Sequence, residues 1–477
     1  MSSSPAQHSA QPAAPSAADY AKDLLSATPA RGSALPGSSQ LDPGLDAPRE
    51  WARSGAMALT GEAAGPPALA PGPLALAARG AGLALAALAP GSESLARLDG
   101  PALLGERAAL AGLGRRGQVA PGGHCRLLPA RDGWLALNLA RPEDRELLPA
   151  WLEAESGPGE DAWDFARRRL ATRSVAAWVE RGRMMGLALA ACSTPAPDPA
   201  PWLQAETLGP ALPPPPPDAA PWVVDLSALW AGPLCSQLLA AAGARVIKVE
   251  NCARPDGARQ AGGDFFDLLN AGKASVALDL RENAGRERLR QLIDRADIVV
   301  ESARPRALAQ WGIDARAPSA QRPGRVWLSI TGHGRQGERG HWVGFGDDAA
   351  VAAGAAVRLA GRPLFCGDAI ADPLTGLHAA VAALAHFRAG RAALLDVSLA
   401  GVTRWALAAG GGDESPAQVQ STHADGSAWR VSTPQGCEAV APPRARPIRQ
   451  RAAALGADNR RILGESNPLA APESPAG

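Results

Sequence analysis

The sequence lacks the features that mark several common classes of protein. Its 477 residues carry a formal net charge of +1 and no long basic block, so neither nucleic acid nor an anionic membrane surface is an expected partner. The most apolar segment, 74–89, is too short to span a bilayer and has Arg79 in its middle. The first residues have neither a basic nor an apolar region of the kind that starts a secretory signal.

Several kinds of site are also missing from the sequence. The six cysteines show no CxxC and no paired spacing, and the seven histidines complete no zinc pattern, so we expect no metal and free thiols in a reducing cytoplasm. No P-loop and no GxSxG motif occur, and Ser329 lies at the end of an expected strand. The dinucleotide fingerprint GxGxxG is absent, because the corresponding turn reads WAGPLCSQ, with Pro233 where a free N–H is needed.

Composition divides the chain into expected domains. Residues 1–48 are rich in Ser, Pro and Ala without periodicity, which predicts a disordered leader. The run LGPALPPPPPDAAP excludes a helix or a sheet interior, and we assign 206–221 to a Pro-rich linker. These segments enclose a small-domain-like unit at 49–205, and 466–477 is expected to be a tail.

The unit before the linker has the pattern of a small α+β domain. HCRLLPA and DGWLALNLA predict two strands joined by a turn at 131–133, followed by the helix PEDRELLPAWLEA with Pro and acids in its first turn. DAWDFARRRLATR and SVAAWVERGRMMG are amphipathic and run into the apolar LALAACS. No catalytic grouping is evident in this unit.

The pattern after the linker is that of an α/β domain. An apolar strand at 222–226, a helix at 233–242 and a second apolar strand at 245–250 form a βαβ unit. Strands with both faces apolar indicate a buried parallel sheet. SVALDL, ADIVVES and RVWLSITG predict further strands, with the helix ENAGRERLRQLIDRA between the first two. We therefore expect a doubly wound, Rossmann-like large domain.

One stretch of this domain places a carboxylate at the start of an apolar helix. Residues 367–385 read GDAIADPLTGLHAAVAALA, with Asp372 directly before Pro373. Pro is favoured at the first helical position, and Asp can accept hydrogen bonds from the N–H groups that follow. Taken alone, the pattern predicts that Asp372 is a helix cap.

Five blocks in this half resemble a known family. VVDLSALWAGPLCSQLLAAAGARVIKVE, FFDLLNAGKASVALDL, ADIVVES, VWLSITGHGRQG and ADPLTGLHAAVAALAHFRAGRAALLDVSLAG resemble, in this order, the class III CoA-transferases, which include the formyl-CoA and carnitine CoA-transferases. The resemblance implies a large domain at 222–400. It also implies a return segment at 401–465, since AALGADNRRILGE looks like the family's C-terminal segment. Members of the family are interlocked dimers, so a homodimer is expected.

The resemblance gives Asp372 a second interpretation. In the family the Asp of the D-x-x-T-G block is the catalytic nucleophile, and here it aligns with Asp372, followed by Thr375 and Gly376. A carboxylate can attack an activated thioester to give a mixed anhydride, which the released CoA thiolate reopens. The implied function is an acyl-CoA:carboxylate CoA-transferase that works through an aspartyl-CoA thioester. A CoA ester is then a substrate, carboxylic acids are the other partners, and no prosthetic group is expected.

The resemblance also implies contacts to CoA. Leu229, Trp230 and Ala231 match the stretch that lines the nucleotide in the family. The turn NAGKA, with Asn270, Lys273 and Ala274, resembles the family's N-x-G-K-R turn, where Lys273 could meet a phosphate. The alternative is that Lys273 is a solvated turn lysine.

Three departures weaken the expected grip on CoA. Asn251 and Gln310 stand at positions where family members often have a basic residue, and Ser302 stands where they usually have an Asn. They leave open the alternative of a catalytically silent CoA-binding or scaffolding homologue. The related acyl-CoA racemases pair the Asp with a His in a G-H-D block, but Gly346 stands at that position and His341 lies five residues away, so two-base racemisation is disfavoured.

The order of the domains also departs from the family, because a small-domain-like unit comes first. Residues 51–89 resemble a decayed copy of 350–385, in which Leu76 stands opposite Asp372 and Arg79 opposite Thr375. The first copy therefore has no nucleophile. We expect a fusion of two truncated members or a permutation, with chemistry in the second half alone.

Overall fold

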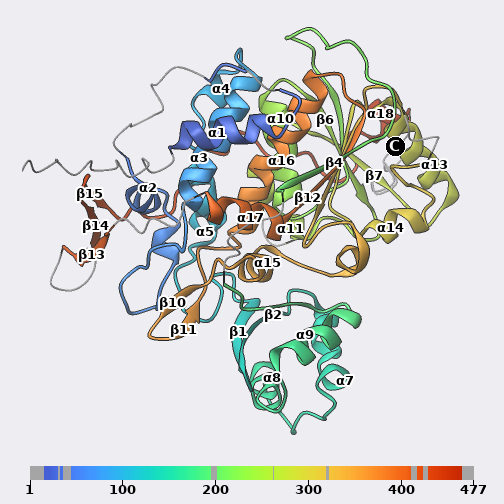
Figure 1. The fold of residues 1–477 in the computed structure, drawn as a ribbon. Coiled ribbons are helices and arrows are strands. Elements are labelled where there is room, and N and C mark those ends of the chain that lie inside the picture. Colours follow the sequence, from blue (N-terminus) through green and yellow to red (C-terminus); the bar gives the residue numbers. More distant parts are fainter. Residues whose placement is uncertain are drawn as a thin grey trace, which may run out of the picture.

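The computed structural model describes residues 16–30, 33–35, 45–194, 201–260, 263–317, 322–409, 416–422 and 428–464. At its centre is a seven-stranded sheet in the order β4-β12-β9-β8-β5-β6-β7. β4 pairs antiparallel with β12, and the other neighbours pair in parallel. Helices lie on both sides of this sheet (Figure 1). The predicted α/β class with a large parallel sheet is thus confirmed.

The elements of the sheet follow the predicted order. Its strands are β4 Leu203–Thr207, β5 Trp222–Asp225, β6 Arg245–Asn251, β7 Ala274–Leu278, β8 Ile298–Glu301, β9 Val326–Thr331 and β12 Ala393–Ser398. Its helices are α10 Ala231–Ala241, α11 Gly257–Gln260, α12 Asp264–Asn270, α13 Asn283–Arg295, α14 Pro305–Gln310, η5 Gly337–His341, α15 Gly346–Ala353, α16 Ala371–Arg388 and α17 Leu399–Ala408. A short hairpin joins α15 to α16, with strands β10 Val357–Leu359 and β11 Arg362–Leu364.

Both faces of the sheet are buried. Val223 belongs to a core cluster that includes α10 and α16, whereas its neighbour Val224 belongs to a second cluster that includes α13. Successive side chains of a strand point to opposite faces, so a strand buried on both must be apolar throughout. This is why the continuous apolar runs predicted the strands correctly.

Residues 125–191 form a separate α+β part below the large sheet (Figure 1). Its strands β1 Cys125–Ala130, β2 Gly133–Asn138 and β3 Ala188–Ala191 pair antiparallel. Its helices are α6 Pro142–Glu146, α7 Leu148–Leu152, α8 Ala162–Leu170 and α9 Val175–Met184. They share a core of their own around Trp151 and Trp178. The predicted hairpin is confirmed, while the helix expected from PEDRELLPAWLEA is two short helices, α6 and α7.

The segment before this part packs on the large sheet instead. It contains α1 Ala17–Ser26, α2 Ala47–Arg53, η2 Met57–Leu59, α3 Leu74–Leu88, α4 Glu93–Ala96, η3 Gly100–Gly105 and α5 Glu106–Ala111. α3 joins the core cluster that holds α16. The range predicted as one small-domain-like unit, 49–205, therefore contains two separately packed parts.

The prediction of a disordered leader is wrong over α1. This helix begins with a capping box between Ser16 and Asp19, and it buries Tyr20, Leu24 and Leu25. The hydroxyl of Tyr20 lies 2.8 Å from Nε2 of His378 in α16. Most of the remaining leader, and the predicted tail, lie outside the described residues.

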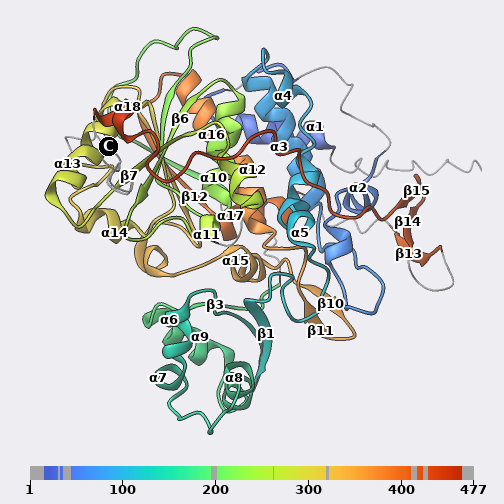
Figure 2. The same cartoon turned by 180° about the vertical axis from the view of Figure 1, so that it is seen from behind.

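The end of the chain crosses several parts of the molecule. After β13 Gln418–Ser421, β14 Trp429–Thr433 and β15 Gly436–Ala439, it runs across the back toward α18 Asn459–Leu463 (Figure 2). There the side chain of Asn459 accepts from Ala277 N–H and donates to Ala277 O in β7. Within the described ranges no helix is long and apolar enough to cross a membrane, and all six cysteines are free thiols.

Candidate functional site

Asp372 lies in the first turn of α16, at the second helical residue. The N-cap is Ile370, and no side chain caps the helix. The interpretation of Asp372 as a helix cap is therefore wrong, because the helix begins one residue before it. Asp372 is instead half-buried beside other carboxylates.

Three carboxylates gather around one arginine at this helix start. Arg107, in α5, donates to Asp368 through Nε at 2.8 Å and through Nη2 at 2.5 Å. Asp347, in α15, accepts from the Ala369 N–H at 2.8 Å, just before α16. The positive charge of Arg107 interacts electrostatically with all three carboxylates, Asp347, Asp368 and Asp372. Asp368 lies four residues before Asp372, outside the D-x-x-T-G block, and its side chain is fully buried in this cluster.

The cluster changes the acidity of its members. Burial raises the pKa of Asp372 to about 7, and the nearby Asp347 and Asp368 add to the rise, while Arg107 and the Gly346 backbone oppose it. Burial likewise raises the pKa of Asp347 to about 6. Asp372 can therefore be a desolvated carboxylate near neutral pH, which is the state that a nucleophilic carboxylate requires.

Position 346 must be a glycine because there is no room for a side chain. A Cβ at Gly346 would collide with a carboxylate oxygen of Asp372 and with Ala369 O. The start of α15 can thus approach Asp372 only without a side chain, and a histidine does not fit there. His341 lies in η5, on the wall of a cleft that Asp372 does not line. This geometry supports the sequence argument against two-base racemisation.

The loop predicted to line the nucleotide packs against Arg107 and against the helix α16 that contains Asp372. The guanidinium of Arg107 lies over the Trp230 ring, 5.3 Å from its centroid. A Cβ at Gly376 would lie 2.9 Å from Ala231 O, so the glycine of the D-x-x-T-G block lets α10 approach α16 closely. Leu229 precedes them in a left-handed conformation, φ 70°, and is 42% exposed. The structure therefore brings Trp230 close to Arg107 and Ala231 close to Gly376 in α16, and Leu229 precedes them in the same loop.

The second group of predicted CoA contacts lies elsewhere. Lys273 is 4% exposed, so the alternative of a solvated turn lysine is wrong. Its ammonium donates to Asp225 at 3.1 Å, Ser236 at 2.7 Å and Asn270 at 2.9 Å, and also to a backbone oxygen. In this conformation Lys273 does not face a phosphate. Asn270 is 2% exposed, and Ala274 is the first residue of β7.

One departure from the family has a structural role. Oγ of Ser302, after β8, accepts a hydrogen bond from the Ala228 N–H at 3.1 Å, directly before Leu229. The Leu229 N–H in turn donates to Asp256 at 2.9 Å. Ser302 and Asp256 thus fix the loop at the switch point between β5 and β8, where parallel sheets commonly bind ligands.

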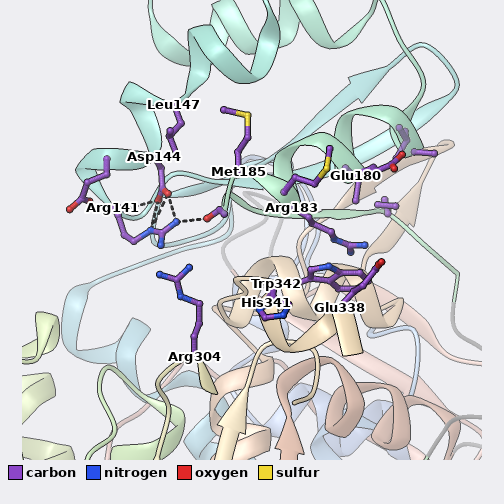
Figure 3. Close-up of a pocket in the computed structure, with 18 of the residues that line it drawn as sticks. Arg141, Asp144, Leu147, Glu180, Arg183, Met185, Arg304, Glu338, His341 and Trp342 are labelled. Atoms are coloured by element: carbon purple, nitrogen blue, oxygen red, sulfur yellow. Dashed lines mark hydrogen bonds and ion pairs between the residues drawn. The ribbon is translucent and has the colours of Figure 1, made fainter. Parts of the chain in front are cut away.

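A cleft of about 1370 Å³ opens between the α+β part and the large sheet (Figure 3). Arg141, Arg183 and Glu180 come from the α+β part, and Arg304, His341 and Trp342 from the other wall. The Arg183 guanidinium lies over the Trp342 ring at 3.7 Å. Trp342 and Gly346 are four residues apart, so their Cα atoms are at most about 14 Å apart. One wall of the cleft thus leads into the start of α15 beside the carboxylate cluster, although Asp372 is not among its lining residues.

The comparisons with known proteins address the same half of the chain. Residues 222–437 match CoA-transferase family III. This match confirms the resemblance found in the sequence. The rearranged domain order stays a prediction.

Individual relatives match over part of their length. The chain is 32% identical over 191 residues to the succinyl-CoA--D-citramalate CoA-transferase of Chloroflexus aurantiacus, covering 37% of this chain and 48% of that one. It is 34% identical over 169 residues to the formyl-CoA:oxalate CoA-transferase of a Bradyrhizobium, covering 33% and 40%. A solved CAIB/BAIF family protein from Brucella suis is 30% identical, with a TM-score of 0.38 over 41% of this chain and 56% of that one. The chain spans about half the length of such relatives.

Sequence reasoning missed Arg107 and the cleft. Arg107 lies 261 residues from its partner Asp368, outside the family match, and no motif surrounds it. The cleft depends on how two parts pack, which no local pattern in the sequence predicts.

Proposed function

We propose that this protein is an acyl-CoA:carboxylate CoA-transferase whose nucleophile is Asp372. The observation that carries the proposal is the position of Asp372, in the first turn of α16 between Gly346 and the Arg107 cluster and inside the segment that matches the family. Its raised pKa and the approach of the Trp230 loop support the same conclusion.

The reaction follows from the chemistry of a carboxylate and a thioester. Asp372 attacks the thioester carbonyl, the C–S bond breaks, and a mixed anhydride and a CoA thiolate result. The thiolate attacks the Asp372 acyl carbon, which releases the donor acid and leaves an aspartyl-CoA thioester. The acceptor carboxylate then attacks this thioester, and the thiolate set free attacks the acyl carbon of the acceptor. The products are a new acyl-CoA and the free Asp372 carboxylate.

Trapping tests this function directly. Protein mixed with an acyl-CoA is treated with hydroxylamine, which attacks the aspartyl thioester, releases CoA and leaves a hydroxamate that mass spectrometry locates. We expect modification at Asp372. If no member of a broad acyl-CoA panel gives it, the alternative of a catalytically silent CoA-binding homologue holds, and this alternative has support in the buried Lys273 and in Asn251 and Gln310.

We propose that the anionic nucleotide of CoA occupies the cleft, with the thioester arm passing the loop that contains Leu229. Arg254 supports this orientation, since it is exposed and lines the cleft after β6. Arg254→Ala should weaken CoA binding about tenfold, seen as a smaller rise in melting temperature at equal CoA concentration. Arg97→Ala, an exposed arginine outside the cleft, is the control. An unchanged rise in Arg254→Ala would place CoA elsewhere.

The arrangement of the large part supports a doubly wound, Rossmann-like domain at 222–400. Its parallel strands lie in the order β12-β9-β8-β5-β6-β7. From β5 the chain adds strands first on one side, β6 and β7, and then on the other, β8, β9 and β12, as in doubly wound folds. The segment after β15 crosses the N-terminal helices before reaching β7, as the proposed return segment requires.

We also propose that the protein is a homodimer. The rival is an internal pseudo-dimer made by the two halves of one chain, which the packing of α3 on α16 favours. Light scattering at micromolar concentration distinguishes them. A particle of 48.8 kDa would exclude the interlocked dimer, and one twice as large would exclude the pseudo-dimer.

A further inference from the structure

The turn that precedes α16 is strained and held from three sides. Gly367 and Ala369 both have left-handed backbone angles, φ 67° and 43°, which an alanine rarely adopts. Such a conformation persists only where surrounding contacts fix it. Asp372 follows directly, so the geometry of this turn decides where its carboxylate points.

Two of the three contacts come from the segment before the family match. Oγ1 of Thr60 accepts from the Gly367 N–H at 2.8 Å, and Arg107 holds Asp368 with two hydrogen bonds. The third comes from Asp347, which accepts from the Ala369 N–H at 2.8 Å. Thr60 and Asp368 are fully buried, so these contacts are shielded from water.

Arg107 also connects this turn to the Trp230 loop. One side of its guanidinium pairs with Asp368, and the group lies over the Trp230 ring. A Cβ at Gly122 would lie 3.1 Å from Nη2 of Arg107, so the backbone there packs tightly against the group. The guanidinium therefore has little freedom to leave its position.

We infer that Arg107, supported by Thr60, is a positioning residue that fixes the turn at 367–369 and thereby aims Asp372 toward the Trp230 loop. The inference rests on the proposed function of Asp372. It assigns a part in the site to the unit before the linker, in which the sequence shows no catalytic grouping. Arg107 touches no reacting atom in this scheme: it fixes the turn through Asp368, and its charge favours the ionised form of Asp372.

The test compares Arg107→Met, Arg107→Lys and the exposed control Arg97→Met in the full chain. The first readout is the titration of Asp372, followed by NMR on protein labelled at the aspartate carboxyl carbon and assigned by its loss in Asp372→Asn. Removing a cation next to a carboxylate should move the Asp372 midpoint up by about one pH unit or more in Arg107→Met. Arg107→Lys should stay near the wild-type value, because the charge remains.

The second readout is the rate of hydroxylamine trapping at pH 9, divided in each variant by the ionised fraction of Asp372 that the NMR midpoint gives. Arg107→Met should trap at least about 100-fold more slowly, since a misplaced reacting group loses this much. Arg107→Lys should recover part of the rate, while KM for the acyl-CoA changes less than kcat. A midpoint and a trapping rate in Arg107→Met that equal those of Arg97→Met would overturn the inference.

The test distinguishes a failure of the proposed function from a failure of this inference. If the wild-type protein gives no adduct, the proposed function fails, yet the NMR midpoint still reports whether Arg107 acts on Asp372. If Arg107→Met does not fold, Thr60→Val provides the second variant, because it keeps the size of the side chain and removes the hydroxyl, which accepts from Gly367 and donates to Ala56 O. It should slow trapping in the same direction by a smaller factor, and an unchanged rate there would overturn the inference.

Discussion

Asp372→Asn should abolish CoA transfer while the protein stays folded. An amide cannot form the mixed anhydride, so the rate should fall by at least about 10⁴-fold, as it does when an enzyme loses a covalent nucleophile. Asparagine has nearly the same size and can still accept the hydrogen bond from the Gly346 backbone. Asp372 caps no N–H of α16, so the free energy of unfolding should change by no more than about 1 kcal/mol. Single-turnover transfer and urea unfolding measure the two effects.

The matched control is Asp164→Asn. Asp164 also lies in the first turn of a helix, α8, but its side chain is 67% exposed and far from the cluster in sequence. We expect full activity from it. Asp368→Asn is not a control, because it would leave Arg107 without its buried partner. Activity retained in Asp372→Asn, together with a melting temperature many degrees lower, would make Asp372 a structural residue.

The large sheet could be predicted from the sequence because its signals are local. Each parallel strand is a short apolar run, and the βαβ unit that starts at Trp222 needs no distant contact to be recognised. The helix α1 was missed because Ser, Pro and Ala dominate the leader. The capping pair Ser16 and Asp19, before an amphipathic stretch, was a signal that could have revealed it.

The same difference between local signals and distant contacts decides which residues of the site could be predicted. Asp372 could be predicted from its block, and Gly376 of that block proved to serve the packing of α10 on α16. Lys273 was misjudged because its partner Asp225 lies 48 residues away and only the fold brings them together. Arg107 is the extreme case, since the contact that gives it a role joins two halves of the chain. Charges buried by tertiary packing leave no local pattern in a sequence.

The pH dependence of transfer should report the ionisation of Asp372. The carboxylate attacks and the acid does not, so kcat/KM for the acyl-CoA should rise about tenfold per pH unit up to about 7 and then level off. The charged groups that face Asp372 are Arg107 from α5, Asp347 from α15 and Asp368 from the preceding turn. An ordinary aspartate, with a pKa of 3.8, would give a flat profile from pH 5 upward.

Unfolding must be excluded as the cause of the loss at low pH. The raised pKa values of Asp347, Asp348 and Asp372, about 6, 7 and 7, mean that the folded state takes up protons first, so these groups favour folding as the pH falls from 7 to 5. Burial lowers the pKa of His333 to about 3 and of His378 to about 4, so these groups oppose folding below their unfolded pKa of 6.5. The two effects offset each other, and the melting temperature should change little across this range. A rate that is independent of pH between 5 and 8 in a folded protein would show that Asp372 is already ionised at pH 5, and the desolvated cluster would then not control its reactivity.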